Sequence, residues 1–206
     1  MATIIFDFDG TIANTFDYAV AFLSDEAGRP PLTKDQKAAL HGLSMARIAR
    51  HLGISWHRLP GLFFKGRHQM NPAMKNIEPF AGMPEVIREL HAKRHKLFIL
   101  STNTTRNINK FLRRHGLEGN FKDVYGGVGM FGKAPALRRL LREQHVETRK
   151  AIYIGDELRD AQAAQSLGVR VVAASWGFSR PVDLKAEGVT GLAKKPADII
   201  RLIEKL

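Results

Sequence analysis

The chain has no cysteine among its 206 residues. This absence excludes disulfide bonds, thiolate metal ligands and cysteine nucleophiles, and it is consistent with a reducing compartment. The sequence also lacks an apolar run long enough to span a membrane and a basic leader at its N-terminus. These absences predict a cytoplasmic protein with no membrane partner.

Acidic residues are scarce relative to basic ones. The 20 Asp and Glu residues face 32 Lys and Arg residues, which gives a formal net charge of +12. Such a charge favours anionic partners, among them nucleic acids and phosphorylated metabolites. The basic residues are scattered, however, with short clusters at 113–115 and 138–142 and no basic tail. This pattern favours a solvated surface over nucleic-acid binding, which stays open as an alternative.

The strongest local pattern lies at the N-terminus. Residues 4–6 and Phe8 form a β-branched and aromatic run without helical spacing, which predicts a strand buried on both faces. Asp7 and Asp9 interrupt the run, and their side chains point the same way from an extended backbone. Buried ionised carboxylates are costly unless a cation pairs with them. Because open α/β sheets bind ligands at the carboxyl ends of strands, we expect a cation-binding pocket here.

Residues 14–79 show helical patterns and no strand-like run. Apolar spacing, N-cap residues and glycine or proline breaks predict four helices in this stretch. Their expected bounds are 15–27, 33–40, 44–52 and 59–74. A block of short helices after the first strand of an α/β protein is interpreted as a helical cap domain covering residues 14–79.

From residue 80 onward, strand and helix patterns alternate. Strands are predicted at 96–100, 123–128, 151–154 and 169–173, and helices at 84–93, 105–115, 133–144, 157–167 and 196–206. Such alternation is typical of βαβ units with right-handed crossovers. The predicted fold class is α/β: a Rossmann-like parallel sheet core with helices on both faces, formed by residues 1–13 and 80–206, plus the small cap.

Polar residues follow the predicted strand at 96–100. Ser101, Thr102 and Asn103 stand at a helix entrance, where hydroxyl and backbone N–H groups suit phosphate oxygens. An ordinary N-cap explains the same residues equally well. The residues by themselves leave both interpretations open.

Two further strand ends carry charged candidates. Lys133 begins a predicted helix, where it opposes the macrodipole, so a phosphate or the strand-end carboxylates would explain its position. Asp156 follows the strand at 151–154, and Asp160 lies one helical turn farther on. Like charges at this spacing are unfavourable unless they share a cation. Acidic residues also favour a first helical turn, although this explains Glu157 better than Asp156.

Together these residues resemble the four ordered motifs of the haloacid dehalogenase-like hydrolase superfamily. The matching motifs are Asp7-x-Asp9-Gly10-Thr11, Ser101 after an apolar strand, Lys133, and Gly155-Asp156-x-x-x-Asp160. The resemblance covers almost the whole chain and is greatest for phosphoglycolate phosphatase-type members, which carry a helical cap. One departure is Lys133-Ala134-Pro135, where many relatives have lysine followed directly by proline.

The resemblance implies a Mg²⁺-dependent phosphatase that acts on a small anionic phosphorylated substrate, such as a phosphoglycolate-like compound or a sugar phosphate. Asp7 would be the nucleophile, Asp9 the general acid and base, and Ser101 and Lys133 would hold the phosphoryl oxygens. Mg²⁺ would be bound by Asp7, Asp156 and the backbone carbonyl of Asp9, with Asp160 or Glu157 assisting. Other substrate-binding candidates are Gly10, Thr11, Thr102 and Asn103.

The cap adds basic candidates for contact with the leaving group: Arg47, Lys65, Arg67 and His68. Asp9 argues against dehalogenation, since the resemblance implies that dehalogenases lack this second aspartate. It does not separate a phosphatase from a hexose-phosphate mutase of the same fold. A nucleic-acid-end phosphatase or a binding protein is a further alternative, and the protein is expected to be a monomer or a homodimer.

Overall fold

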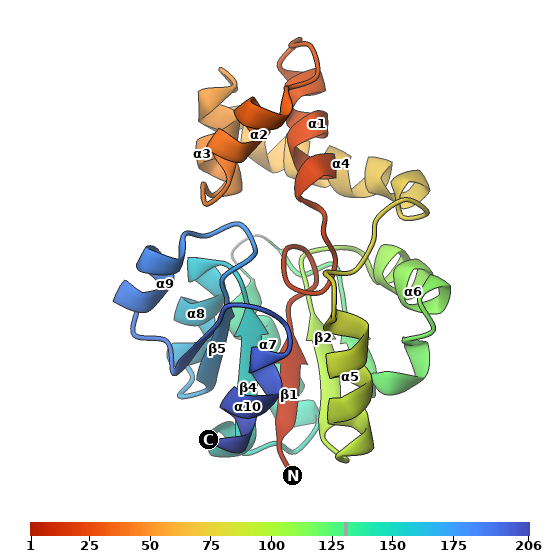
Figure 1. Cartoon of the computed structure of the whole chain (residues 1–206), viewed down its shortest axis with the longest axis vertical. Helices are drawn as coiled ribbons and strands as arrows, with labels where there is room; N and C mark the ends of the chain where they lie inside the picture. The colour runs from red at the N-terminus through yellow and green to blue at the C-terminus, as the bar shows by residue number, and fades with distance from the viewer. Residues whose placement is uncertain (130–131) are drawn as a thin grey trace.

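The computed structural model describes residues 1–129 and 132–206. Six strands form one parallel sheet in the order β3-β2-β1-β4-β5-β6. Their bounds are β1 Thr3–Phe6, β2 Lys96–Leu100, β3 Asp123–Tyr125, β4 Ala151–Gly155, β5 Arg170–Ala174 and β6 Gly191–Ala193. This sheet confirms the predicted α/β fold class with β1 at its centre (Figure 1).

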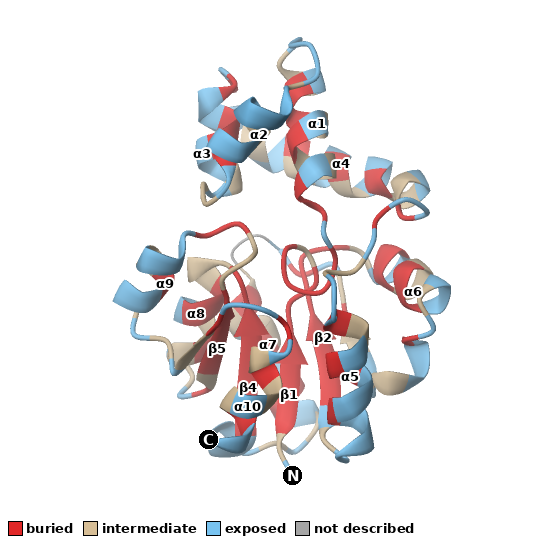
Figure 2. Cartoon of the chain, viewed as in Figure 1, coloured by how far each residue is buried: buried red, intermediate tan, exposed pale blue. Residues whose placement is uncertain are grey.

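Helices cover both faces of the sheet because the buried strands alternate their side chains between two cores. Ile4 and Phe6 of β1 belong to one core cluster and Ile5 to the other. The first face is covered by α5 (Met83–Ala92), α6 (Thr105–Arg114) and α10 (Asp198–Glu204). The second is covered by α7 (Lys133–Glu143) and α8 (Leu158–Gln165). Figure 2 shows the strands buried between these layers.

Four helices lie above the carboxyl ends of the strands (Figure 1). They are α1 (Phe16–Glu26), α2 (Lys34–Leu40), α3 (Met45–His51) and α4 (Leu59–Ala73), and they share an apolar cluster of their own. The two connecting segments run side by side, since Asn14 donates to the carbonyl of Glu78 and Phe80 to that of Ile12. The division into a core and a cap stays a prediction, and these paired segments lie at its expected boundary.

The sequence analysis did not predict two short elements near the C-terminus, α9 (Pro181–Ala186) and β6. Each is too brief for a periodic apolar pattern to stand out. The strand expected at 123–128 ends earlier, at Tyr125, and Glu157 precedes α8 instead of opening it. In the part of the chain that the structure describes, no helix is long and apolar enough to cross a membrane.

Candidate active site

Three carboxylates meet where β1 and β4 end. Asp7 follows β1 directly, Asp156 follows β4, and Asp160 lies in the first turn of α8. One oxygen from each lies within 4.8 Å of the others, and all three residues are buried. We refer to Asp7, Asp156 and Asp160 as the carboxylate cluster. The sequence predicted that these strand ends lie close together, and they do so because β1 and β4 are neighbours in a parallel sheet.

The carboxylate cluster has the chemistry of a site for a hard divalent cation. Its donors are all oxygens, and Oδ2 of Asp160 is buried without a hydrogen-bond partner among the described residues. Burial and neighbouring carboxylates raise the pKa of Asp160 to about 8 and that of Asp156 well above its usual value. These residues fit Mg²⁺, which takes carboxylate oxygens and keeps several waters. Glu157 is outside the cluster and pairs with Arg159 instead.

Lys133 supplies the one positive charge in direct contact with the cluster within the described chain. Its buried ammonium donates to Oδ2 of Asp7 at 2.7 Å and also pairs with Asp160. Burial would lower the pKa of Lys133, but the charges of Asp160 and Asp7 raise it well above its usual value. Burial by itself would raise the pKa of Asp7. The positive charge of Lys133 outweighs this effect, so the pKa of Asp7 lies below its usual value. Asp7 is thus kept ionised.

Asp9 lies apart from the carboxylate cluster and has a different environment. Its Oδ1 accepts a hydrogen bond of 3.1 Å from Nδ2 of Asn103. Burial and the negative charge of Asp7 raise the pKa of Asp9 to about 7. A carboxyl group with this pKa can both give and take a proton near neutral pH, as a general acid and base must.

A chain of asparagines connects Asp9 to helix α4. Oδ1 of Asn103 accepts from Nδ2 of Asn107 at 2.9 Å, and the same amide group donates to the carbonyl of Arg67. Asn71 on α4 donates in turn to Oδ1 of Asn107 at 2.8 Å. Both Asn103 and Asn107 are buried. Sequence reasoning missed Asn107, whose only signal was a polar residue on the otherwise apolar face of α6.

Gly10 and Thr11 lie against Asp156 and do not line the cavity. Oγ1 of Thr11 donates to Oδ1 of Asp156 at 2.7 Å, and the backbone N–H of Phe178 donates to Oδ2 at 2.7 Å. Gly10 has φ +78°, and a Cβ there would overlap Oδ2 of Asp156. Gly177 is equally tight, because a Cβ on it would overlap the same carboxylate group.

Replacing Gly177 with alanine is therefore expected to destabilise the protein by about 1–3 kcal/mol, since the added methyl group must displace Asp156. The same displacement should weaken Mg²⁺ binding. Thermal unfolding with and without Mg²⁺ measures both effects. Gly119→Ala is the matched control, because a Cβ at Gly119 meets nothing within 4 Å. Equal melting temperatures for the two variants would contradict this account of Gly177.

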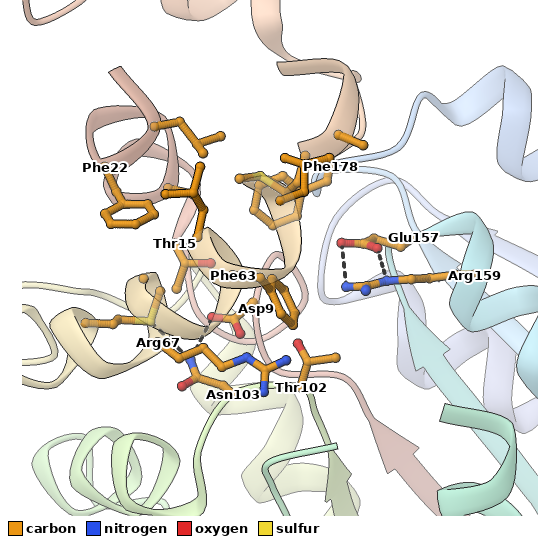
Figure 3. A pocket seen from close by; sticks show the side chains of 18 of the residues that line it. Asp9, Thr15, Phe22, Phe63, Arg67, Thr102, Asn103, Glu157, Arg159 and Phe178 are labelled. Carbon is orange, nitrogen blue, oxygen red and sulfur yellow. Dashed lines mark hydrogen bonds and ion pairs between the residues drawn. The ribbon is translucent and has the colours of Figure 1, made fainter. Parts of the chain in front are cut away.

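A cavity of about 560 Å³ opens between helices α1, α3 and α4 and the strand ends. Asp9, Thr102, Asn103 and Lys133 line it together with Arg67 and Arg159, and most of them are drawn in Figure 3. Ser101 is fully buried and does not line the cavity; its Oγ accepts from the N–H of Asn103 at 3.1 Å. Ser101 is also not the N-cap of α6, a position that Thr104 takes.

Of the four basic residues expected to contact the leaving group, Arg47, Lys65 and His68 do not line this cavity. Lys65 is exposed and pairs with Glu26 at 2.5 Å. Arg47 lines a separate hollow beside α9. Arg67, the fourth candidate, does line the main cavity, with its guanidinium stacked 3.9 Å from the ring centroid of Phe63. Composition alone marked the cap as basic, but helical phase decides which basic side chain points inward.

Comparison with known proteins agrees with this geometry. A family model described as haloacid dehalogenase-like hydrolase matches residues 4–174, and the chain belongs to this family. It is 31% identical over 209 residues to the phosphoglycolate phosphatase of Synechococcus elongatus, covering 100% of this chain and 99% of the relative. It is 22% identical over 210 residues to pyrophosphatase PpaX of Listeria welshimeri, covering 98% and 96% respectively. The chain is thus an enzyme of the phosphatase type.

The fold is shared with solved structures at lower identity. A haloacid dehalogenase-like family hydrolase from Streptococcus pneumoniae superposes with a TM-score of 0.78 at 20% identity, and the match covers 98% of each chain. A likeness at this identity concerns the architecture of sheet and helices alone.

Proposed function

We propose that the chain is a Mg²⁺-dependent phosphatase that hydrolyses a small organic phosphate monoester through an aspartyl-phosphate on Asp7. The observation that carries the proposal is the pairing of two carboxyl groups in opposite environments: Asp7 beside Lys133, with its pKa lowered, and Asp9, with its pKa raised to about 7. A nucleophile must be ionised and a general acid must hold a proton, so the two environments match the two tasks.

In the first half of the reaction, a carboxylate oxygen of Asp7 attacks phosphorus and the P–O bond to the alcohol breaks. Asp9 gives its proton to the leaving oxygen, which departs as a neutral alcohol. The ammonium group of Lys133 forms an ion pair with Asp7. Lys133 also lines the cavity, where its charge offsets that of the phosphoryl oxygens. Thr102 and Asn103 line the same cavity and would orient the phosphoryl group.

In the second half, Asp9 takes a proton from water as the water attacks the aspartyl-phosphate, and inorganic phosphate leaves. Asp7 is restored as a carboxylate and Asp9 as an acid. A Mg²⁺ ion held by Asp7, Asp156 and Asp160 would supply charge neutralisation for the phosphoryl group. Arg67 and Arg159 line the cavity, and they add positive charge near Asp9 and near Asp7 respectively.

Phosphate release from a substrate panel tests the proposal. The panel contains phosphoglycolate, which the name of the Synechococcus relative suggests, glucose 6-phosphate, a nucleotide and a 5′-phosphorylated oligonucleotide. We expect turnover of at least one monoester, lost on chelation of Mg²⁺ and restored by its return. Isomerised sugar phosphate without phosphate release would indicate a mutase. Turnover that is unchanged by a chelator would contradict the metal requirement.

The proton on Asp9 predicts a pH dependence. Because Asp9 has a pKa of about 7, its acid form predominates below pH 7 and disappears above it. For an alkyl phosphate, kcat/KM is therefore expected to fall about tenfold per pH unit above pH 7. An aryl phosphate, whose leaving phenolate is a weaker base, should lose less. Initial rates between pH 5 and 9 check this, and parallel profiles for the two substrates would argue against Asp9 as the acid.

A further inference from the structure

The main cavity has two chemically different ends. Asp9, Thr102, Asn103 and Lys133 gather at the end above the strands. The other end is formed by side chains from α1, α3 and the start of α4: Tyr18, Phe22, Leu23, Met45, Leu59 and Leu62. Figure 3 shows Phe22 and Phe178 on the side of the cavity away from Thr102 and Asn103.

Polar partners are scarce at the apolar end. The hydroxyl group of Tyr18 already donates to the carbonyl of Gly66 at 3.1 Å. A sugar or a carboxylate placed against Phe22, Leu23 and Leu62 would leave its oxygens without hydrogen bonds. Burying such unpaired polar groups costs binding free energy. An alkyl or aryl group placed there would instead leave water for an apolar surface.

The size of the cavity leads to the same conclusion. A volume of about 560 Å³ lies in the usual range for sites that enclose a ligand with its apolar part inside. A phosphate group with two further carbons would occupy the polar end alone. Arg67, stacked on Phe63, lies at the polar end beside Thr102 and Asn103 (Figure 3), and its buried Nε has no hydrogen-bond partner among the described residues. The remaining space thus belongs to the leaving group.

Resting on the phosphatase function proposed above, we propose that the preferred substrate is a phosphate monoester of an apolar alcohol, alkyl or aryl. Its phosphoryl group lies beside Asp9 and Lys133, and its hydrocarbon part lies among the side chains of α1, α3 and α4. The cap thereby selects substrates through hydrocarbon burial, and its basic surface residues such as Lys65 take no part in the selection.

A series of n-alkyl phosphates from ethyl to hexyl, with phenyl phosphate, phosphoglycolate and glucose 6-phosphate as comparators, tests the proposal. Each buried methylene group is expected to raise kcat/KM about fourfold, so hexyl phosphate should exceed ethyl phosphate about 200-fold. Hexyl and phenyl phosphate should both exceed phosphoglycolate and glucose 6-phosphate. Turnover that is independent of chain length, or greatest for phosphoglycolate, would overturn the proposed selectivity while leaving the phosphatase function standing.

Alkylphosphonates separate failure of selectivity from failure of catalysis, because they lack the ester bond that is cleaved. Their affinity, measured by isothermal titration calorimetry with Mg²⁺ present, should rise with chain length in the same proportion. Phosphonate affinity that rises with chain length, with no phosphate release from any n-alkyl phosphate, would sustain the apolar site and contradict the phosphatase function. Affinity that does not change with chain length would contradict the apolar site.

Ala19 on α1 and Ala46 on α3 line the cavity and allow it to be filled from either helix. Ala19→Leu and Ala46→Leu should each lower kcat/KM for hexyl phosphate at least tenfold and change that for ethyl phosphate less than twofold. Ala38→Leu on α2 is the matched control, since Ala38 is exposed and outside the cavity lining. Equal losses for both substrates in both variants, with unchanged melting temperatures, would count against the assignment.

Discussion

Replacement of Asp7 with asparagine is expected to lower kcat by at least about 10⁴-fold, because the amide oxygen cannot attack phosphorus to form the covalent intermediate. Asparagine has nearly the same shape, so the backbone bond from Asp7 N–H to the carbonyl of Ile154 should remain. Lys133 would still donate to the side-chain oxygen at position 7. The loss should therefore fall on the chemical step rather than on folding.

Steady-state phosphate release and thermal unfolding, measured side by side, check this expectation. Asp17→Asn is the matched control, because Asp17 is exposed on α1 and pairs only with Lys37 in the described chain. Acid quenching with a labelled phosphate monoester should trap protein-bound phosphate in the native chain and none in Asp7→Asn. A variant that keeps a tenth of the native kcat would eliminate Asp7 as the nucleophile.

The strand-end residues could be predicted because local pattern and topology agree at these positions. Asp7 and Asp156 each follow an apolar strand, and parallel strands place such residues at the same edge of the sheet. The sequence also indicated that Lys133 begins a helix and was unusual there. A charge at an unfavourable place in a secondary-structure element is visible in sequence before any contact is known.

The sequence named Arg67 among four basic candidates but could not single it out, because the choice depends on helix orientation. Lys65 and Arg67 are two residues apart on α4, so they point in nearly opposite directions. Only the packing of Leu62, Gly66 and Met70 against the rest of the protein determines that Arg67 faces the cavity. Gly66 makes this packing close, because the ring of Phe22 lies against its Cα.

The loop around Gly177 and Phe178 gave no signal either. Phe178 binds Asp156 through its backbone N–H, and any residue except proline could supply that group. Position 177 needs glycine because a Cβ there would overlap Asp156, and the sequence alone does not reveal this close approach. Backbone donors and close approaches are thus the parts of this site that needed three-dimensional structure.

Replacement of Lys133 with methionine has the second large effect that we expect, on stability as well as on activity. Methionine fills a similar volume without charge, so it leaves Asp7 and Asp160 buried beside each other with no cation. Removing one partner of a buried ion pair typically costs about 3–5 kcal/mol. In the presence of a chelator, urea unfolding of Lys133→Met should show a loss of this size. With Mg²⁺ present, its phosphate release should fall below detection.

Lys37→Met provides the control for a lost ammonium group. Lys37 forms an exposed pair with Asp17, and such pairs contribute less than about 1 kcal/mol. If Lys133→Met is no less stable than Lys37→Met in chelator, the ion pairs in the carboxylate cluster do not stabilise the fold.

Mg²⁺ should restore part of the stability of Lys133→Met, because a cation then meets carboxylates that no longer face a competing ammonium group. A ligand that binds only the folded state stabilises it by RT ln(1 + [L]/Kd), so the gain on adding Mg²⁺ measures affinity directly. We expect this gain to be larger for Lys133→Met than for the native chain. An equal or smaller gain would mean that Mg²⁺ binds away from Asp7 and Asp160. A larger gain without recovered activity would separate the two roles of Lys133: a replaceable charge in folding, and a required one in phosphoryl transfer.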